Sequence, residues 1–431
     1  MATLTECAHS GLDIFESPGL QTSIEHAEYV EYRPLSTLDD GPIEFSVVGG
    51  SEYLDLSNTF LKVRGKIVLP DGGDLPAARN VVPVNLTLHS LFSDVSMYLN
   101  GTQVTTTSGA YPYQAYIQTV LSYGRAAKES HLEASMFYPD TAGHFDAVAG
   151  GNNSGMVKRK ARGAESKVIG MIGRLHADLF HQCKCLINHV DWRMKLSRNR
   201  DNFLLMCDQV AGDYPAYKMV ILDCSLFVRK VSVSPSVLLA HSKILEGTNA
   251  VYPFTKTVMR VFSAAQGSLN FTLDNLFLER LPNRVVFGFI RTDSYNGVVT
   301  RNPYKFEHVN LNFVSLYCHG TQIPTKGLRP NFATQEYTEA YMTLYTGTGT
   351  AWSDQSCGIK LSEYDGGYAL YCFDLTASMV HSHSAVDPSR PGPLRLECTF
   401  SDALEVPYNL VMYAEFAGSV EVTKTREVLV F

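Results

Sequence analysis

The chain has 431 residues, of which 45% are hydrophobic, 18% charged and 11% aromatic, and its formal net charge is −7. This apolar fraction excludes a disordered or fibrous chain, and the length predicts two or three domains. The charged fraction is low against the average of about 25% for globular proteins. We therefore expect much of the surface to be covered by the protein itself or by further copies of it.

The charge is unevenly distributed along the chain. Residues 1–60 hold 11 acidic residues and one basic residue, Arg33, which gives −10. The remaining residues hold 35 basic against 32 acidic side chains, which gives +3. An acidic N-terminal segment is the reverse of what an arm that holds nucleic acid requires.

The nine cysteines are odd in number and scattered in spacing, so they imply no disulfide framework. The N-terminal residues lack the basic region and the apolar stretch of a secretory signal. No run approaches the ~18 apolar residues of a membrane-spanning helix. We therefore expect synthesis in a reducing cytoplasm or nucleus and no transmembrane segment.

Strand patterns dominate the chain. Residues 1–28 have little periodicity, and we expect them to form an extended N-terminal arm. Residues 43–48 and 59–69 then show strand patterns, and residues 96–104 indicate a hairpin with Asn100-Gly101 as its turn. Further strands are predicted over 173–180, 190–196, 216–232, 257–264, 283–291, 310–318, 368–375, 393–400 and 409–422.

Helical patterns are few. Residues 112–123 place Tyr116, Ile117, Val120 and Leu121 on one helical face, and residues 334–345 repeat that spacing. The sequence therefore predicts a mainly β protein with one short helix in each half, an arrangement typical of sandwiches or barrels.

The two halves of the chain resemble each other. Residues 95–104 read VSMYLNGTQV and residues 314–323 read VSLYCHGTQI, with six of ten positions identical. Each copy is followed by one of the two predicted helices. Weaker matches pair 174–180 with 370–376, 215–220 with 407–411 and 53–61 with 269–278.

This repeat predicts a duplicated β-domain. Eight antiparallel strands in two facing sheets make a jelly roll, which limits exposed sheet edges. We expect an arm over 1–28, a first jelly roll over 29–233 and a second over 234–431, with Ser234-Pro235-Ser236 as the linker. The alternative is two unrelated sandwiches that share common hairpin chemistry.

Two stretches point to a family. Residues 25–68, especially EYLDLSNTFLKV at 52–63, and residues 173–196 resemble the major capsid proteins of Polinton (Maverick) elements and the related adintoviruses. The resemblance implies a double jelly-roll protomer that forms pseudo-hexagonal homotrimers. Such trimers would tile an icosahedral shell around double-stranded DNA, so that the protein would be located in the virion.

The same resemblance implies partners. They would be neighbouring capsomers, a single jelly-roll penton protein, minor capsid proteins and the enclosed DNA, without specific base contacts. In such families the N-terminal arm commonly lies on the inner side. Because the arm of this chain is acidic, we hypothesise that it latches onto a neighbouring capsomer rather than holding DNA.

A basic run follows the glycine-rich residues 149–155. Lys158, Arg159, Lys160 and Arg162 could contact a polyanion or a neighbouring capsomer, because such side chains neutralise phosphates. No aromatic residues are interleaved to stack on a single strand. A solvated, flexible loop is the plainer interpretation, and we expect residues 143–167 and 346–356 to form outer towers or to contact neighbours.

Two groups of residues could be mistaken for metal sites. The first is His181, Cys183, Cys185 and His189. Structural zinc usually requires Cys-x₂₋₄-Cys and His-x₃₋₅-His pairs, whereas Cys-x-Cys places both thiols on one side of a strand. Buried thiols and ordinary histidines are the plainer interpretation.

The second group is His381, His383 and Asp387, because two-domain jelly-roll enzymes, the bicupins, bind metal through His-x-His and a carboxylate. Here Leu375 stands where that family has a glycine. A bicupin-like metal-dependent enzyme and a carbohydrate-binding jelly-roll module remain the alternatives. The chain carries neither a G-x-S-x-G elbow nor a phosphate-binding loop, so we predict no catalytic activity and no cofactor.

Overall fold

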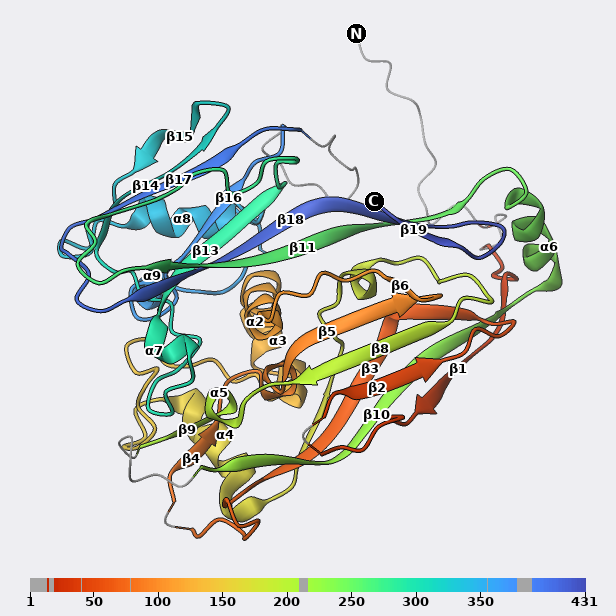
Figure 1. The fold of residues 1–431 in the computed structure, drawn as a ribbon, viewed down its shortest axis with the longest axis horizontal. Helices are drawn as coiled ribbons and strands as arrows, with labels where there is room; N and C mark the ends of the chain where they lie inside the picture. The colour runs from red at the N-terminus through yellow and green to blue at the C-terminus, as the bar shows by residue number, and fades with distance from the viewer. Residues whose placement is uncertain are drawn as a thin grey trace.

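The strands of the computed structural model form two sandwiches that lie side by side (Figure 1). The structure describes residues 14, 19–39, 41–77, 79–208, 216–354, 356–377 and 390–431. In the first sandwich, the sheet β1-β10-β3-β7 faces the sheet β2-β8-β5-β6. In the second, β11-β18-β13-β16 faces β12-β17-β14-β15, and β19 extends the former along β18.

The strands of the first half are β1 (Ile24–Tyr32), β2 (Ile43–Val47), β3 (Tyr53–Val68), β4 (Val81–Pro83), β5 (Phe92–Leu99), β6 (Thr102–Gln103), β7 (Ile169–Gly173), β8 (Trp192–Arg198), β9 (Leu205–Cys207) and β10 (Lys218–Val233). Those of the second half are β11 (Ala250–Ala264), β12 (Asn270–Leu273), β13 (Arg284–Arg291), β14 (Leu311–Cys318), β15 (Thr321–Leu328), β16 (Leu370–Asp374), β17 (Leu394–Phe400), β18 (Tyr408–Val422) and β19 (Val428–Val430). Strands β4 and β9 pair separately.

The two sandwiches have the same strand order. The strands of the two sandwiches correspond in chain order. Each sheet of the first becomes a sheet of the second when β1, β2, β3, β5, β6, β7, β8 and β10 are replaced, in that order, by β11 to β18. Both sandwiches are antiparallel throughout these pairings. The predicted fold class, two consecutive eight-stranded jelly rolls, is therefore confirmed.

The repeated motif forms the same hairpin in both sandwiches. Asn100 and Gly101 join β5 to β6 with φ values of 46° and 85°, and His319 and Gly320 join β14 to β15 with 51° and 79°. A two-residue turn with two positive φ values matches the twist of the flanking strands. Residues 95–104 and 314–323 are thus structural counterparts.

Both predicted helices are present, but the expectation of one helix in each half is wrong. The helices of the described residues are α1 (Thr87–Ser90), α2 (Tyr111–Ser122), α3 (Arg125–Lys128), α4 (Ser154–Gly163), α5 (Asp201–Leu204), α6 (Pro235–Ile244), α7 (Thr292–Tyr295), α8 (Thr338–Thr346) and α9 (Leu361–Tyr364). Short 3-10 turns are η2 (His131–Ser135), η3 (Ala164–Ser166) and η4 (Asp178–His181).

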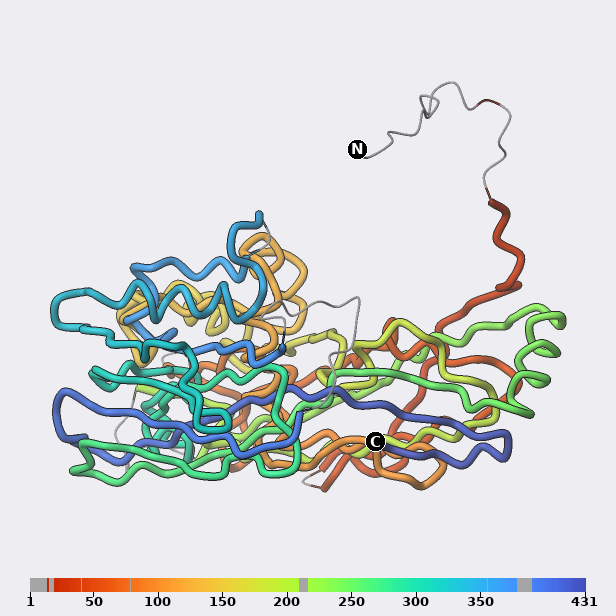
Figure 2. The backbone as a smooth tube through the Cα atoms, turned by 90° about the horizontal axis from the view of Figure 1, so that it is seen from above, coloured from red at the N-terminus to blue at the C-terminus, as the bar shows by residue number. Residues whose placement is uncertain are grey.

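The helices α2 to α4 connect β6 to β7, and α8 and α9 make the equivalent connection from β15 to β16. Figure 2 shows α2, α3 and α8 rising on the same face of the molecule, at the top of that view. Among the described residues, no helix has the length and apolar character needed to cross a membrane.

Two sequence-based predictions need correction. The predicted strand 173–180 is coil followed by η4, because the true strand β7 ends at Gly173. The counterpart of β3 is β13, so the match of 53–61 with 269–278 is wrong. Strand β1 begins at Ile24, inside the predicted arm, and the expected linker opens α6. Residues 1–13 and 15–18 of that arm lie outside the described residues.

One hydrophobic cluster extends through both sandwiches. Alternate residues of each strand point inward, as Ile43, Phe45 and Val47 do on β2, where all three are at most 1% exposed. Burying one such side chain contributes about 1.5–3 kcal/mol relative to leaving it in water. Tyrosines of α2 connect the two halves of this core, as described below.

Candidate assembly surface

The basic run that the sequence singled out belongs to a helix rather than to a flexible loop. Helix α4 begins after Asn153, whose side chain accepts a hydrogen bond from the backbone N–H of Met156 at 3.2 Å. An amide oxygen at this position satisfies one of the donors that a helix start leaves free. The expected loop over residues 143–167 is therefore wrong where α4 lies.

The four basic residues of α4 have different surroundings. Lys158 and Arg162 are exposed, and Lys160 is half-buried. The ammonium of Lys158 lies 3.4 Å from the Glu133 carboxylate, an exposed pair that contributes little stability. Lys158 and Arg162 are accessible to a partner, and a polyanion or inter-capsomer contact by them stays a prediction.

Arg159 is removed from that surface because its side chain is fully buried. Its guanidinium donates to the Asp140 carboxylate at 2.7 Å and to the carbonyl oxygens of Pro83 and Tyr138 at 3.0 and 2.8 Å. A buried ion pair is tolerated when further hydrogen bonds satisfy its remaining donors. Arg159 therefore fixes α4 to β4 and to the segment before the helix.

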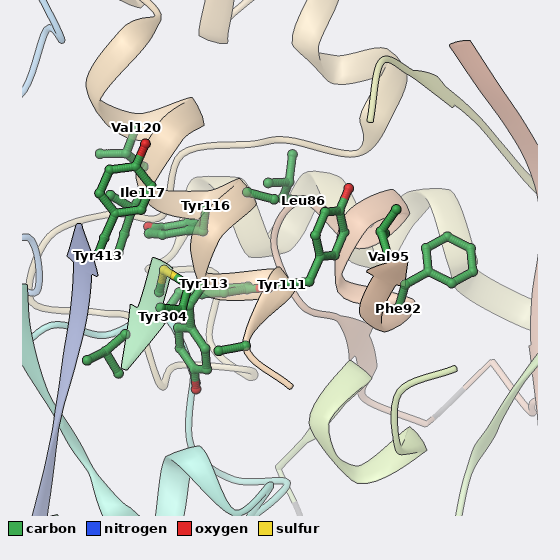
Figure 3. Close-up of a cluster of buried hydrophobic side chains, with 14 of the residues drawn as sticks. Leu86, Phe92, Val95, Tyr111, Tyr113, Tyr116, Ile117, Val120, Tyr304 and Tyr413 are labelled. Carbon is green, nitrogen blue, oxygen red and sulfur yellow. The ribbon is translucent and has the colours of Figure 1, made fainter. Parts of the chain in front are cut away.

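Aromatic side chains join the two sandwiches (Figure 3). The ring of Tyr116 on α2 stacks on Tyr304 of the second half, with 4.3 Å between centroids, and Tyr113 meets the same ring edge-on at 5.7 Å. The hydroxyl groups of Tyr304 and Ser90 are hydrogen-bonded at 2.5 Å. This contact makes the two sandwiches one packed body.

A second, polar seam lies between α2 and η4 on one side and the strands β11 and β18 on the other. The Asp178 carboxylate accepts a hydrogen bond from the backbone N–H of Thr257 at 3.0 Å, and the Gln118 amide donates to the Tyr413 hydroxyl at 3.1 Å. Burial raises the pKa of Asp178 from 3.8 to about 7, which the Thr257 N–H only partly offsets. A cavity of about 180 Å³ opens beside Gln118 and Tyr413.

The buried histidines of this seam are neutral. Nδ1 of His176 donates to the Gln118 side-chain oxygen at 2.7 Å, because an amide oxygen only accepts. The His89 ring meets the His176 ring edge-on at 4.7 Å. Burial lowers the pKa of His89 to about 3 and that of His176 well below its ordinary value.

The residues weighed as metal ligands do not form a cluster in the described part of the chain. Cys183 is exposed, Cys185 is half-buried and neither is in a disulfide. Nδ1 of His181 faces the Arg174 guanidinium at 3.0 Å. No group of three or more His, Cys, Asp or Glu side chains within the described ranges is placed to hold a metal ion. His381, His383 and Asp387 lie outside those ranges.

The exposed helix α6 was not predicted from the sequence. It begins with Pro235 at its first turn directly after Ser234, and none of its residues is buried. A Ser followed by Pro at the first helical position is a helix-start signal that could have identified it. Helix α6 exposes the two large apolar side chains Leu239 and Ile244.

Sequence comparison identifies one curated relative. No protein-family model matches the chain. An uncharacterized protein of Caenorhabditis elegans is 24% identical over 372 residues, which are 83% of this chain and 86% of the relative.

Solved structures are similar over nearly the whole chain. The Sputnik virophage cryo-EM structure matches with a TM-score of 0.68 at 12% identity, covering 99% of this chain and 93% of that one. The PBCV-1 virus capsid matches at 0.61 and 9% identity, covering 96% and 98%. The mavirus major capsid protein matches at 0.55 and 11% identity, covering 99% and 95%. These structures are of viral capsids and not of enzymes, and the similarity shows that the chain has the double jelly-roll fold.

Proposed function

We propose that the protein is a structural major capsid protein of the Polinton (Maverick) or adintovirus type. The observation that carries this proposal is the double sandwich itself, with one strand order repeated over a single core. The similarity to viral capsid structures covers this whole architecture rather than one half of it. A protein of this kind works through its shape and its surfaces, and it needs no catalytic site.

The proposed assembly unit is a homotrimer. Three protomers with two jelly rolls each, 29–233 and 234–431, place six similar sandwiches around one axis and give a pseudo-hexagonal capsomer. Obligate interfaces of this class bury about 2,000–5,000 Å². The low charged fraction of the chain supports extensive contact between copies, because apolar and weakly charged walls are stable when covered.

The capsomers would tile an icosahedral shell around double-stranded DNA. Partners in this proposal are neighbouring capsomers, a single jelly-roll penton protein and minor capsid proteins, and the protein would be located in the virion after synthesis in the cytoplasm or nucleus. DNA would be enclosed without specific base contacts. The exposed Lys158 and Arg162 are candidates for inter-capsomer or polyanion contacts.

The test is the mass of the purified full chain by light scattering, followed by negative-stain imaging. We expect a particle of about three times the chain mass with a hexagonal outline. A protein that stays monomeric at high concentration contradicts the proposal. Stoichiometric bound iron, zinc or manganese would instead favour the bicupin-like enzyme, and glycan binding by a monomer would favour the carbohydrate-binding module.

A further inference from the structure

The helix α6, which links the two sandwiches, has an apolar sequence and is largely exposed, although Leu238 packs against the core. It reads PSVLLAHSKI, and none of its ten residues is buried. Leu239 is 73% exposed and Ile244 is 61% exposed. Scattered exposed apolar residues are ordinary, whereas a contiguous apolar patch marks an interaction site.

A pocket lies directly beside this helix. Its volume is about 300 Å³, and the side chains of Ile187, Ile244, Leu245, Val251 and Tyr252 line it. One wall is held in place by hydrogen bonds from the Ile187 N–H to the Tyr252 hydroxyl and between Tyr53 and His241, both at 2.9 Å. We name this cavity, together with the C-terminal end of α6 that lines it, the α6 pocket.

Three cations lie in or near the α6 pocket, and one carboxylate, that of Glu421, accepts a hydrogen bond from the lining residue Asn249 at 2.9 Å. The Lys184 ammonium donates to the Val251 carbonyl oxygen at 2.9 Å, at the pocket wall, and Arg426 donates to the Asn188 side chain at 2.7 Å. Lys243 is exposed on α6 itself. Within the described ranges, no carboxylate forms an ion pair with any of these three cations. An apolar segment flanked by acidic residues is the complementary occupant.

The N-terminal segment of this chain has that chemistry. Residues 1–22 contain Glu6, Asp13 and Glu16 and no lysine or arginine. Asp13 and Glu16 flank Ile14 and Phe15, so two apolar side chains lie between two carboxylates. A segment of this composition would place its apolar pair in the pocket and its charges beside those cations.

The fold also places the C-terminal end of this segment beside α6. The Ser234 N–H, at the beginning of α6, donates to the Ser23 carbonyl oxygen at 2.9 Å. The eight residues from Phe15 to Ser23 can span at most about 29 Å when extended. Within the protomer, however, Ile14 is 74% exposed and Leu20 is 87% exposed, so neither side chain covers its own pocket.

We propose that the α6 pocket binds the stretch from Asp13 to Glu16 of a second copy of this chain. Each protomer then contributes one acidic, apolar segment and one basic-rimmed pocket, so the contact continues from copy to copy. This inference rests on the proposed function, since it needs neighbouring copies. It gives the acidic N-terminus a protein partner instead of DNA.

The test is photo-crosslinking in the full chain with benzoylphenylalanine in place of Phe15. Unlabelled and ¹⁵N-labelled proteins are mixed before assembly, and the crosslinked peptides are identified by mass spectrometry. We expect crosslinks between residue 15 and residues 184–187 or 235–252, with the two isotopes joined in one product. Crosslinks confined to one isotope assign the segment to its own chain and overturn the proposal, as do crosslinks elsewhere on the body.

A matched pair of variants checks the pocket. The double variant Leu239→Asp with Ile244→Asp should lower the crosslink yield at least tenfold. Leu278→Asp, at a residue that is 64% exposed on the loop after β12, should leave the yield unchanged. Thermal unfolding confirms that both variants fold, since each changes only exposed side chains.

The outcomes separate this contact from the proposed function. If trimers form but no crosslinks appear at the α6 pocket, the proposed contact is wrong and the proposed capsomer is unaffected. Trimers in which the double variant crosslinks as well as the control also overturn the contact. A protein that remains monomeric contradicts both the capsomer and the contact between copies.

Discussion

The ring of Tyr116 lies parallel to the ring of Tyr304, with 5° between the planes, and this stack joins the two sandwiches. Both side chains are completely buried. The Tyr304 hydroxyl is hydrogen-bonded to Ser90, whereas the Tyr116 hydroxyl has no partner among the described residues. The aromatic surface of Tyr116 therefore stabilises this junction, and its hydroxyl group does not.

The first prediction separates these two parts of Tyr116. Tyr116→Ala should lower the free energy of unfolding by about 3–5 kcal/mol, because it leaves a cavity in the core. Tyr116→Phe should change it by less than about 1 kcal/mol, since the phenol donor that it removes is unpaired. Urea denaturation measures both values, with Tyr29→Ala as an exposed control. An equal loss for the Ala and Phe variants would contradict the argument.

The second prediction concerns the buried pair of Arg159 and Asp140. Arg159→Met should destabilise the fold by about 3–5 kcal/mol, because it leaves the Asp140 carboxylate buried without its cation. Adding Asp140→Asn should recover part of that loss, since the buried charge is then absent and the amide oxygen can still accept from the side chain of Asn153 or Asn302. Denaturant titration of the single and double variants gives the coupling energy.

The control for this pair is Lys158→Met, one residue away on the exposed face of α4. Its side chain is 60% exposed, so we expect a change within about 0.5 kcal/mol. If the Arg159 and Lys158 variants were equally stable, the assignment of Arg159 to a structural role would be wrong.

The third prediction is a pH dependence that originates at Asp178. The folded protein holds the Asp178 proton more tightly than the unfolded chain, because burial raises this pKa to about 7. The stabilisation is therefore complete below about pH 4 and is lost as the pH rises through 7. Asp178→Asn does not titrate, and the Asn oxygen can still accept from Thr257.

The measurement for Asp178 is the melting temperature of both proteins between pH 4 and pH 8. The stability of the Asn variant relative to the native protein should rise by about 2–4 kcal/mol over this range, since one pKa unit corresponds to about 1.4 kcal/mol. Asp402→Asn, on an exposed turn, should show no such trend. If the stability difference between Asp178→Asn and the native protein did not change with pH, the prediction would be wrong.

The fourth prediction has the opposite sign and concerns His89. Burial lowers its pKa to about 3, so below pH 6.5 the unfolded chain takes up a proton that the folded protein does not. The native protein should lose stability as the pH falls from 6.5 toward 3. His89→Gln should lose less over the same interval, while the exposed His131→Gln should follow the native protein. Chemical denaturation at pH 7, 6, 5 and 4 compares the three.

Local signals explain which parts of the fold could be predicted. The turn at Asn100-Gly101 needs two positive φ values, which these residues adopt readily. The hairpin could therefore be predicted from these two residues. Helix α2 was likewise predicted because its apolar spacing is local. Strand β7 was misplaced because it has five residues, two of them glycines, and carries almost no strand signal.

Contacts between distant segments explain what could not be predicted. Arg159 lies in the sequence KRKARG, which is typical of a solvated surface, yet its partners Pro83, Tyr138 and Asp140 fold around it. Nothing in its neighbouring residues distinguishes it from Lys158. The α6 pocket is similar, because its walls come from the loop before β8, from α6 and from β11.

The shared core has a mechanical consequence. The two sandwiches cannot hinge against each other without exposing Tyr116 and Tyr304 to water, so the protomer behaves as one stiff block. Under the proposed function, a closed container built from such blocks must accommodate its curvature at the joints between them. The same protomer shape would then serve flat facets and bent edges alike, with the adaptable parts confined to its rim.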